Sequence, residues 1–509
     1  MSAPGTPAPL PPLGPGRPVA PIAIEGGAAA ATDRLAATRV EVDDATLARL
    51  RDVCAEVVDD PAVCAEASRD WWPLAMIWAL DGQVPARAHV VARPTSAAEV
   101  AAVLRVCHDA HVPVTAAGGR SGVCGASVPV HGGVVLDLTA LAGVVSVDDA
   151  SLTAEVLPGT FGDHLEAELR ERHGLTLGHW PQSIALSTVG GWVACRGAGQ
   201  LSNRYGKIED MVVGLEVALA DGRIIRTGGA PRSAVGPDLT QLFVGSEGTL
   251  GIVTSATLRL RPAPVVERRA AYGFATWDDG MEACRRILRR GATPAVLRLY
   301  DEIESARSHG TELTVLLVLD EGDPAIVDAA MAVTAEECAG AERLDDALVE
   351  GWMGHRNEVS ALESLVRNRF VVDTMEISAP WGALPAIYRE TVAALRAVDG
   401  VRVASAHQSH AYVDGACLYF TFAGRPDDPD ERESFYRACW DAGTRAVLDH
   451  GGSLSHHHGV GLHRARFVAD ALGDALDVIA ATKAALDPHG ILNPGKLGLP
   501  DPFGSPGWP

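Results

Sequence analysis

Three glycine-rich blocks between residues 115 and 253 constrain this chain more than any other feature. They are TAAGGRSGVC (115–124), PQSIALSTVGGWVACRGAG (181–199) and GSEGTLGIV (245–253). One such block is typical of a tight turn or a close backbone crossing, because glycine has no Cβ atom. Three together indicate a main chain that approaches a ligand. The first block suits a diphosphate, since it combines paired glycines with the Ser121 hydroxyl and no acidic residue occurs between positions 110 and 136.

The residues before the first block predict how it is presented. A strand over His89–Ala92 is followed by a capping box at Ser96 and Glu99, which opens a helix. One face of that helix is apolar, and a second strand follows at Val112–Thr115; the apolar residues are Val100, Val103, Leu104 and Cys107. A strand–helix–strand unit that ends in a glycine-rich turn is the arrangement by which α/β proteins offer backbone N–H groups to a phosphate.

Changes in local composition divide the chain into five segments. We expect a disordered Pro/Ala-rich tail (1–32), a helical N-terminal extension (33–87), a mixed-sheet domain that carries the glycine blocks (88–262), a separate α+β domain (263–445) and a C-terminal segment (446–509) with a helix over Val468–Leu486.

Composition excludes several classes of protein. Lys and Arg number 43 against 65 Asp and Glu, a formal charge of −22, so nucleic acid and anionic membranes are not expected partners. Hydrophobic residues make up 47% of the chain, enough for a large core, yet no stretch is long enough to span a membrane. The nine cysteines are scattered without CxxC spacing, and the proline-broken N-terminus lacks the pattern of a signal peptide. We therefore expect a reduced, cytoplasmic protein.

Several common cofactor and catalytic motifs are absent from the sequence. It contains no GxGxxG, GxxxxGK[ST], GxSxG or HExxH pattern. The nicotinamide, P-loop, α/β-hydrolase and zincin interpretations therefore lose their main support.

Two long segments and one short one resemble a known family. The long ones cover residues 181–217 (PQSIALSTVGGWVACRGAGQLSNRYGKIEDMVVGLEV) and 236–262 (GPDLTQLFVGSEGTLGIVTSATLRLRP), and the short one is GGSLSHHHGVG at 451–461. Both long segments are similar to the FAD-binding half of vanillyl-alcohol-oxidase-type (PCMH-type) flavoproteins. The short one, with EISAPW (376–381) and DGACLYF (414–420), resembles the branch of the alkyldihydroxyacetonephosphate synthases. The resemblance runs from about Arg93 to Lys496 and implies an α+β fold: an FAD-binding domain of two subdomains, followed by a cap domain and a C-terminal segment that closes the flavin site.

The resemblance also implies which residues bind FAD. The first block would hold the diphosphate, the second would line the isoalloxazine and ribityl region, and the third would hold the adenosine side. The expected cofactor residues are Thr115, Ala116, Ala117, Gly118, Gly119, Arg120 and Ser121; Pro181, Gln182, Ser183, Ser187, Thr188, Cys195, Arg196, Gly197 and Ala198; and Glu247, Gly248, Gly251, Ile252 and Val253.

The three consecutive histidines His456, His457 and His458 are candidate catalytic residues, because imidazole titrates near neutral pH. Proton transfer beside the flavin, a structural hydrogen-bonded role and a metal site are the three interpretations. If the run is extended, His456 and His458 share one face and His457 takes the other, which leaves two ligands where zinc needs at least three. We therefore expect no metal.

Tyr419 is the fourth candidate catalytic residue. Strand alternation in ACLYFTF places Cys417, Tyr419 and Thr421 on one face and the intervening Leu and Phe residues on the other. A core tyrosine is the alternative, but the resemblance places Tyr419 at the family's catalytic tyrosine. A phenol with an ordinary pKa near 10 would need a neighbouring group to lower it.

The sequence departs from the synthase branch at a substrate-binding arginine. Counted back from Trp381, the family's position falls on Leu362, and Arg356, Arg367 and Arg369 lie near it but out of register. A buried phosphate needs a fixed guanidinium, so this departure weakens the case for a phosphorylated substrate. We include Arg367 among the substrate-binding residues, although the sequence does not decide which of the three replaces the family's arginine. Arg298, in LRLYD, is the second, and it would bind a carboxylate.

Three functions remain open at this stage. The favoured one is an oxidoreductase that takes hydride from a hydroxyl-bearing carbon, as in a 2-hydroxy acid, onto flavin N5. The second is a synthase-like transferase that exchanges acyl for alkyl through an N5 adduct. The third, a flavin-binding protein without activity, is disfavoured by Tyr419 and the histidine run. We expect a small-molecule substrate, while the electron acceptor and the assembly state, a homodimer included, stay open.

Arg120 generates a prediction about cofactor attachment. Related flavoenzymes that bind FAD covalently often carry histidine directly after the paired glycines, and here that residue is Arg120, which cannot form a histidyl–flavin bond. We therefore predict that urea denaturation followed by ultrafiltration moves all of the yellow colour into the filtrate. Flavin that stays with the denatured chain would contradict non-covalent binding.

Overall fold

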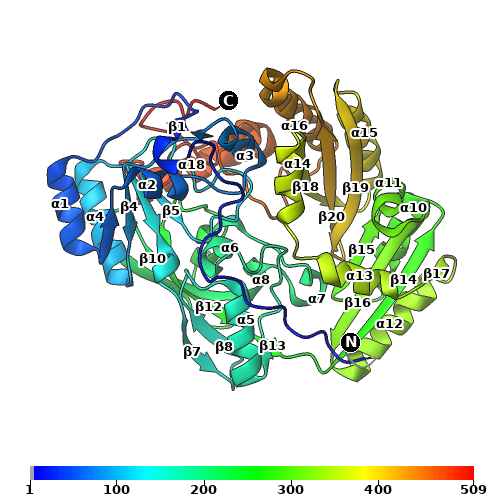
Figure 1. The fold of residues 1–509 in the computed structure, drawn as a ribbon. Coiled ribbons are helices and arrows are strands. Elements are labelled where there is room, and N and C mark those ends of the chain that lie inside the picture. Colours follow the sequence, from blue (N-terminus) through cyan, green and yellow to red (C-terminus); the bar gives the residue numbers. More distant parts are fainter. Residues whose placement is uncertain (1–4, 509) are drawn as a thin grey trace.

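The computed structural model describes residues 5–508 and shows two lobes that face each other. In Figure 1 the first lobe runs from blue to cyan-green and the second from green to yellow-brown, while the red C-terminal segment lies against the first lobe. Helices and sheets are mixed in the way expected for an α+β protein, and the expected fold class is confirmed.

A four-stranded sheet in the first lobe carries the first glycine block. Its strands, in spatial order, are β2 (Glu56–Val58), β4 (Val90–Arg93), β6 (Val134–Asp137) and β5 (Val114–Ala117), with β4, β6 and β5 parallel. The connection between β4 and β5 is α4 (Ala97–Ala110), which packs beside α1 (Asp44–Val53). The Ser96 side chain accepts a hydrogen bond from the backbone N–H of Glu99, so the predicted N-cap is confirmed, but the Glu99 carboxylate accepts from the backbone N–H of Thr95 and not from that of Ser96. The first glycine block follows β5 directly.

A five-stranded antiparallel sheet forms the other part of the first lobe. Its strands, in spatial order, are β11 (Ile224–Gly228), β10 (Val212–Ala218), β12 (Ile252–Arg259), β8 (Thr153–Val156) and β7 (Val144–Asp148). The short helices of this part are α5 (Gly162–Glu168), α6 (Val189–Cys195), α7 (Ser202–Tyr205), α8 (Ile208–Met211) and α9 (Leu239–Phe243). Strands β9 (Leu175–Thr176) and β13 (Arg261–Pro262) pair next to the start of the second lobe. The second glycine block includes α6, and the third leads into β12.

The second lobe is built on a seven-stranded antiparallel sheet. Its strands, in spatial order, are β17 (Glu342–Leu344), β14 (Val266–Phe274), β16 (Thr314–Gly322), β15 (Val296–Tyr300), β19 (Val401–Ala411), β20 (Gly415–Gly424) and β18 (Val371–Pro380). Its helices are α10 (Trp277–Arg289), α11 (Glu302–His309), α12 (Pro324–Glu337), α13 (Ala347–His355), α14 (Ser360–Arg367), α15 (Leu384–Arg396) and α16 (Arg432–Asp449).

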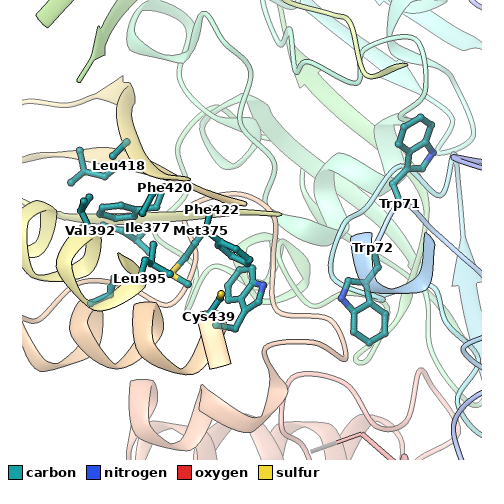
Figure 2. Packing of buried hydrophobic residues seen from close by; sticks show 14 of the residues in the cluster. Trp71, Trp72, Met375, Ile377, Val392, Leu395, Leu418, Phe420, Phe422 and Cys439 are labelled. Atoms are coloured by element: carbon teal, nitrogen blue, oxygen red, sulfur yellow. The ribbon is translucent and has the colours of Figure 1, made fainter. Parts of the chain in front are cut away.

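Alternation along β20 gives the sheet of the second lobe one apolar face and one polar face. Leu418, Phe420 and Phe422 are fully buried against α15 and α16, and Figure 2 shows them gathered with Met375, Ile377, Val392, Leu395 and Cys439. Tyr419 and Thr421 line a cavity on the opposite side of the sheet, as the two-residue period predicts. Burial of the apolar face thereby fixes which side chains reach that cavity.

The N-terminal segments are more ordered than their composition predicts. Ile22 and Ile24 lie in the main core, and the Ile22 carbonyl accepts a hydrogen bond from the buried Arg69 guanidinium, so residues 5–32 are not the disordered tail that we expected. Besides α1, α2 (Pro61–Ala67) and α3 (Pro73–Ala79), the extension 33–87 supplies β2 to the four-stranded sheet, and β1 (Thr32–Asp33) pairs with β3 (Gln83–Val84). The expected boundary at residue 88 therefore passes through a sheet. Residues 1–4 of the tail lie outside the described part of the chain.

The C-terminal segment returns to the first lobe. The helix expected over Val468–Leu486 is two helices, α17 (Val468–Leu472) and α18 (Ala475–Leu486), because Gly473 between them has a φ of 52°. Beyond α18, Leu492 bridges to Val114 at the start of β5, and Lys483 donates hydrogen bonds to the carbonyls of Thr249 and Leu492. Within residues 5–508 no helix has the length and apolarity needed to cross a membrane.

Candidate active site

A cavity of about 1020 Å³ lies between the two lobes and is lined by all three glycine-rich blocks. Its opposite wall comes from the polar face of the second lobe's sheet, from α13 and α14, and from the histidine run. The cavity is therefore where the sequence's two sets of candidate residues, for cofactor binding and for catalysis, come together.

Glycine is required where the first two blocks cross. A Cβ atom on Gly119 would lie 2.0 Å from the Leu186 carbonyl oxygen, and one on Gly118 would lie 2.3 Å from Thr188 Oγ1. The Thr188 hydroxyl is buried without a hydrogen-bond partner among the described residues, and so are both ring nitrogens of His179. Burial lowers the pKa of His179 to about 3, which keeps its ring neutral. Unpaired polar groups beside a main-chain cradle fit a ligand with many hydrogen-bonding atoms, and FAD has this chemistry.

Most of the expected cofactor residues do line the cavity. Two do not: Thr115 is buried within β5, and Arg196, at the C-terminus of α6, hydrogen-bonds Gln241 and lies 3.5 Å from Glu209. The expected cofactor residues that do line the cavity are Ala116, Ala117, Gly118, Gly119, Arg120 and Ser121; Pro181, Gln182, Ser183, Ser187, Thr188, Cys195, Gly197 and Ala198; and Glu247, Gly248, Gly251, Ile252 and Val253.

Two charged cofactor candidates have partners within the protein. Arg120 lines the cavity in a left-handed conformation, with its guanidinium 3.4 Å from the Asp137 carboxylate. Glu247 accepts hydrogen bonds from the backbone N–H groups of Val460 (2.6 Å) and Gly461 (2.7 Å). The Glu247 carboxylate therefore ties the C-terminal segment to the third glycine block and so helps to close the cavity.

The buried carboxylate of Glu376, on β18, organises the histidine run. It accepts hydrogen bonds from the backbone N–H groups of His456, His457 and His458, at 3.2, 3.0 and 2.7 Å, and from the Ser455 hydroxyl at 2.6 Å. Its second oxygen pairs with the fully buried guanidinium of Arg464. Burial alone would raise the pKa of Glu376, but Arg464, His458 and these donors hold it well below the usual range. Neither Glu376 nor Arg464 was among the residues predicted from the sequence.

The histidine run is bent rather than extended, because all three of its N–H groups point to one carboxylate. His457 and His458 line the cavity and His456 does not, so the arrangement considered for an extended run, with His456 and His458 on one face, does not apply. Nδ1 of His456 lies 2.8 Å from Nδ1 of His457, and the Tyr412 hydroxyl lies 2.8 Å from His456 Nε2. Burial lowers the pKa of His456 to about 3 and those of His457 and His458 below their usual value, so the three rings are neutral at pH 7.

His410, on β19, joins this cluster as a fourth imidazole that the sequence did not reveal. Its Nδ1 lies 2.8 Å from the Ser202 hydroxyl, and its ring stacks on His456 at 4.9 Å between centroids. One ring nitrogen from each of His410, His456 and His457 lies within 4.8 Å of the others, a grouping that could hold a metal ion. The sequence argument against a metal counted only two ligands; the fold provides a third, so the number of ligands no longer argues against a metal.

Tyr419 is placed among groups that can exchange a proton with it. Its hydroxyl accepts a hydrogen bond from Thr374 Oγ1 (3.1 Å) and lies 3.3 Å from His458 Nε2, and its ring stacks on His407. Burial raises the pKa of Tyr419, so the phenol keeps its proton at neutral pH. The neighbouring His407 and His458 do not lower this pKa, because burial keeps both rings uncharged.

The two arginines predicted to bind substrate lie in different places. Arg298 lines the cavity, where it donates hydrogen bonds to the Tyr300 hydroxyl (2.7 Å) and to His407 Nε2 (2.6 Å). His407 Nδ1 in turn donates to the Glu304 carboxylate at 2.8 Å. Arg367 is exposed on α14, pairs with Glu363 four residues earlier on the same helix, and does not line the cavity, so the structure does not support its expected role in substrate binding.

Of the three arginines near the family's position, Arg356 is the one that lines this cavity, while Arg367 and Arg369 do not. Arg356 follows the last residue of α13, lines the cavity, and lies between Trp180 and Trp352, with its Cζ 5.1 and 5.6 Å from the ring centroids. One terminal nitrogen of its guanidinium is buried without a hydrogen-bond partner in the described part of the chain. Burial lowers the pKa of Arg356 to about 10, so it stays charged at neutral pH. Arg356 is visible in the sequence as a nearby arginine, but it lies six residues before Leu362, the position that corresponds to the family's substrate-binding arginine.

Glu376→Gln tests the organising role of this carboxylate. The change leaves the Arg464 guanidinium buried without its counter-charge, which should lower the free energy of unfolding by about 3–5 kcal/mol at pH 7. Because folding depresses the pKa of Glu376, its contribution is complete above the unfolded value of about 4.3 and is lost below it. Urea unfolding should therefore show the same loss from pH 5 to pH 8.

The matched control is Glu363→Gln, which removes the exposed partner of Arg367 and should leave the urea midpoint nearly unchanged. An equal effect of the two substitutions, or no effect of Glu376→Gln, would contradict the role given to Glu376.

Two families of known proteins match this chain. The FAD binding domain matches residues 88–228, and the FAD linked oxidases, C-terminal domain, matches residues 263–497. The chain is 33% identical to an uncharacterised FAD-linked oxidoreductase, YgcU, of Escherichia coli K12, over 76% of this chain and 83% of that protein. It is 31% identical to the glycolate oxidase subunit GlcD of Bacillus subtilis, over 80% and 88%. It is 30% identical to the alkyldihydroxyacetonephosphate synthase of Trypanosoma brucei brucei, over 72% and 65%.

Solved structures share the fold. An alkyldihydroxyacetonephosphate synthase aligns with a TM-score of 0.74 at 23% identity, over 91% of this chain and 86% of that one. p-Cresol methylhydroxylase aligns with a TM-score of 0.73 at 19% identity, over 91% and 99%. The matched families, the relatives and the glycine-lined cavity together show that this chain is a flavoprotein with FAD as its cofactor, and that it belongs to the FAD-linked oxidoreductase family with the vanillyl-alcohol-oxidase-type fold.

Proposed function

We propose that this protein is an FAD-dependent oxidoreductase that oxidises a small anionic alcohol of the 2-hydroxy-acid class. The observation that carries the proposal is the second lobe's wall of the cavity. There the unpaired guanidinium of Arg356, the proton-bearing Tyr419 and the neutral His457 all face the space that the glycine blocks also line. These residues provide an anion-binding group, a hydrogen-bond donor and a base in a single cavity.

The substrate's anionic group would bind at Arg356. A guanidinium forms paired hydrogen bonds with a carboxylate, and burial between two tryptophans strengthens such a pair because water is excluded. Arg298 is a weaker candidate for this task, since Tyr300 and His407 already accept hydrogen bonds from its guanidinium. Arg298 would instead hold the His407 ring in place, and that ring stacks on Tyr419.

His457 would take the hydroxyl proton of the substrate. Its Nδ1 faces His456, while its Nε2 makes no hydrogen bond to another described residue. Because burial keeps its pKa low, the ring is unprotonated and ready to accept a proton at neutral pH. Tyr419 retains its proton, so it would donate a hydrogen bond to the substrate oxygen. FAD, when bound, supplies the acceptor for the hydride that leaves the hydroxyl-bearing carbon.

A synthase-like transferase is the second candidate. It is favoured by the SLSHHHGVG segment, by Tyr419, and by the relationship to the Trypanosoma synthase. In that reaction an acyl group is exchanged for an alkyl group, with no net oxidation. Its phosphorylated substrate would also need an anion-binding residue, so Arg356 serves both candidates and does not separate them.

Anaerobic mixing of the FAD-loaded protein with a panel of 2-hydroxy acids separates the two candidates. Loss of the flavin's visible absorbance is expected with at least one acid, because hydride transfer reduces the flavin. If no acid bleaches the flavin, and an acylated glycerone phosphate instead changes the spectrum and releases fatty acid, the transferase is correct and our proposal is wrong.

Tyr419→Phe should abolish turnover while leaving FAD bound, since only the hydroxyl is removed and the ring still stacks on His407. Steady-state activity and the ratio of flavin to protein absorbance measure the two effects. Turnover at the wild-type rate would remove Tyr419 from the mechanism.

Arg356→Leu should raise the KM for the anionic substrate about tenfold to hundredfold, the size expected for loss of a charge-assisted hydrogen bond. The flavin content should not change. The matched variant Arg367→Leu removes an arginine that lies outside the cavity and should leave KM unaltered. If Arg367→Leu raises KM and Arg356→Leu does not, the assignment of the anion-binding residue is wrong.

A further inference from the structure

A second, smaller cavity of about 220 Å³ lies apart from the flavin cavity and shares none of its lining residues. It lies at one end of the second lobe's sheet, where β18 begins, β19 begins and β20 ends. Its lining, which we call the arginine hollow, consists of Arg369, Arg402, Arg425, Pro426, Asp427, Pro429 and Arg432.

Strand register brings three of these arginines together. Gly424, at the end of β20, pairs with Val371 of β18 on one side and with Val401 of β19 on the other. Arg425, Arg402 and Arg369 are each within two residues of these paired positions. The guanidinium carbons of Arg402 and Arg425 lie 6.0 and 5.9 Å from the centroid of the Phe370 ring. The pairing of the three strands therefore brings the arginines together. The Phe370 ring lies close enough to the guanidinium groups of Arg402 and Arg425 for cation–π contact.

Arg369, Arg402 and Arg425 are exposed, and none of them forms an ion pair with a described residue. In the described part of the chain, no carboxylate lies within 4.0 Å of a guanidinium nitrogen of Arg369, Arg402 or Arg425, and their side chains make no hydrogen bond. Arg432 differs, since it pairs with Asp81 and donates to the Pro429 carbonyl, which fixes its position. Asp427 is the one carboxylate in the lining and remains free of an ion pair.

A free cluster of positive charge is unusual in a chain with a formal charge of −22, in which many surface arginines are paired with carboxylates. Three unpaired guanidinium groups against the single carboxylate of Asp427 leave an excess of positive charge around the hollow, and a bound anion would reduce their mutual repulsion. Guanidinium groups suit tetrahedral phosphate oxygens, because each offers two parallel N–H donors. The concave shape favours a small anion over the flat face of a protein.

We propose that the arginine hollow is a second ligand site, which binds a phosphate group through Arg369, Arg402 and Arg425. The group can be inorganic phosphate or the phosphate of a small ester, since the same donors serve both. Strand β18 runs from the hollow to the flavin cavity, where Val372, Asp373 and Thr374 are lining residues. A bound phosphate would therefore lie a few residues along one strand from the active site, without entering it.

Isothermal titration of the FAD-loaded protein with inorganic phosphate, and separately with glycerol 3-phosphate, tests the site at low ionic strength. Saturable binding of at least one probe is expected, and Arg402→Gln with Arg425→Gln should weaken it at least tenfold. Tighter binding of one probe identifies the free ion or the ester as the preferred ligand. The flavin absorbance of the double variant should equal that of the wild type, since neither residue lines the flavin cavity.

The matched control is Arg389→Gln, which removes an exposed arginine of α15 that pairs with Asp278. It should bind phosphate like the wild type. Absence of saturable binding to the wild type, equal affinity in the double variant, or an equal loss in the control would overturn the proposal.

Discussion

The hydrogen bonds accepted by Glu376 are the constraint on which the active site depends. A single buried carboxylate accepts hydrogen bonds from three consecutive N–H groups and one hydroxyl, and it pairs with the buried Arg464 guanidinium. Glu376 stands directly opposite Tyr419 in the pairing of β18 with β20. The pairing of the two strands therefore fixes Tyr419 relative to the histidine run. As a result the Tyr419 hydroxyl lies 3.3 Å from Nε2 of His458, 39 residues later in the chain.

Glycine contributes to the same site in two ways. At Gly118 and Gly119 the absence of a side chain allows the first and second blocks to cross, which forms the cradle. At Gly461 a Cβ atom would lie 2.2 Å from the Cys124 carbonyl, so the C-terminal segment can close on the first block only because that residue is glycine. The glycine pattern therefore reflects chain packing as much as direct access to the cofactor.

Local patterns predicted part of this structure well. Three such features depend on neighbouring residues in the chain: the N-cap of α4 at Ser96, the alternation that turns Tyr419 to the cavity and Phe420 to the core, and the position of the glycine blocks. The resemblance to flavoproteins supplied the rest of the fold, and the matched families confirm it.

The features that sequence reasoning missed depend on contacts between distant residues. The bend of the histidine run is imposed by Glu376, 80 residues before His456, and the order of residues 5–32 comes from contacts such as that of Ile22 with Arg69. Arg356 and Arg367 look equally suitable in the sequence. Only the fold shows that α13 delivers the first to the cavity between two tryptophans, while α14 leaves the second in solvent.

We propose that the glycine-lined cradle and the wall that carries Tyr419 and His457 belong to one flavin site. A crystal structure of the FAD-loaded protein tests this most directly. We expect a diphosphate on the main chain of residues 117–121 and an isoalloxazine ring next to both Tyr419 and His457. A flavin ring that contacts neither side chain would contradict it.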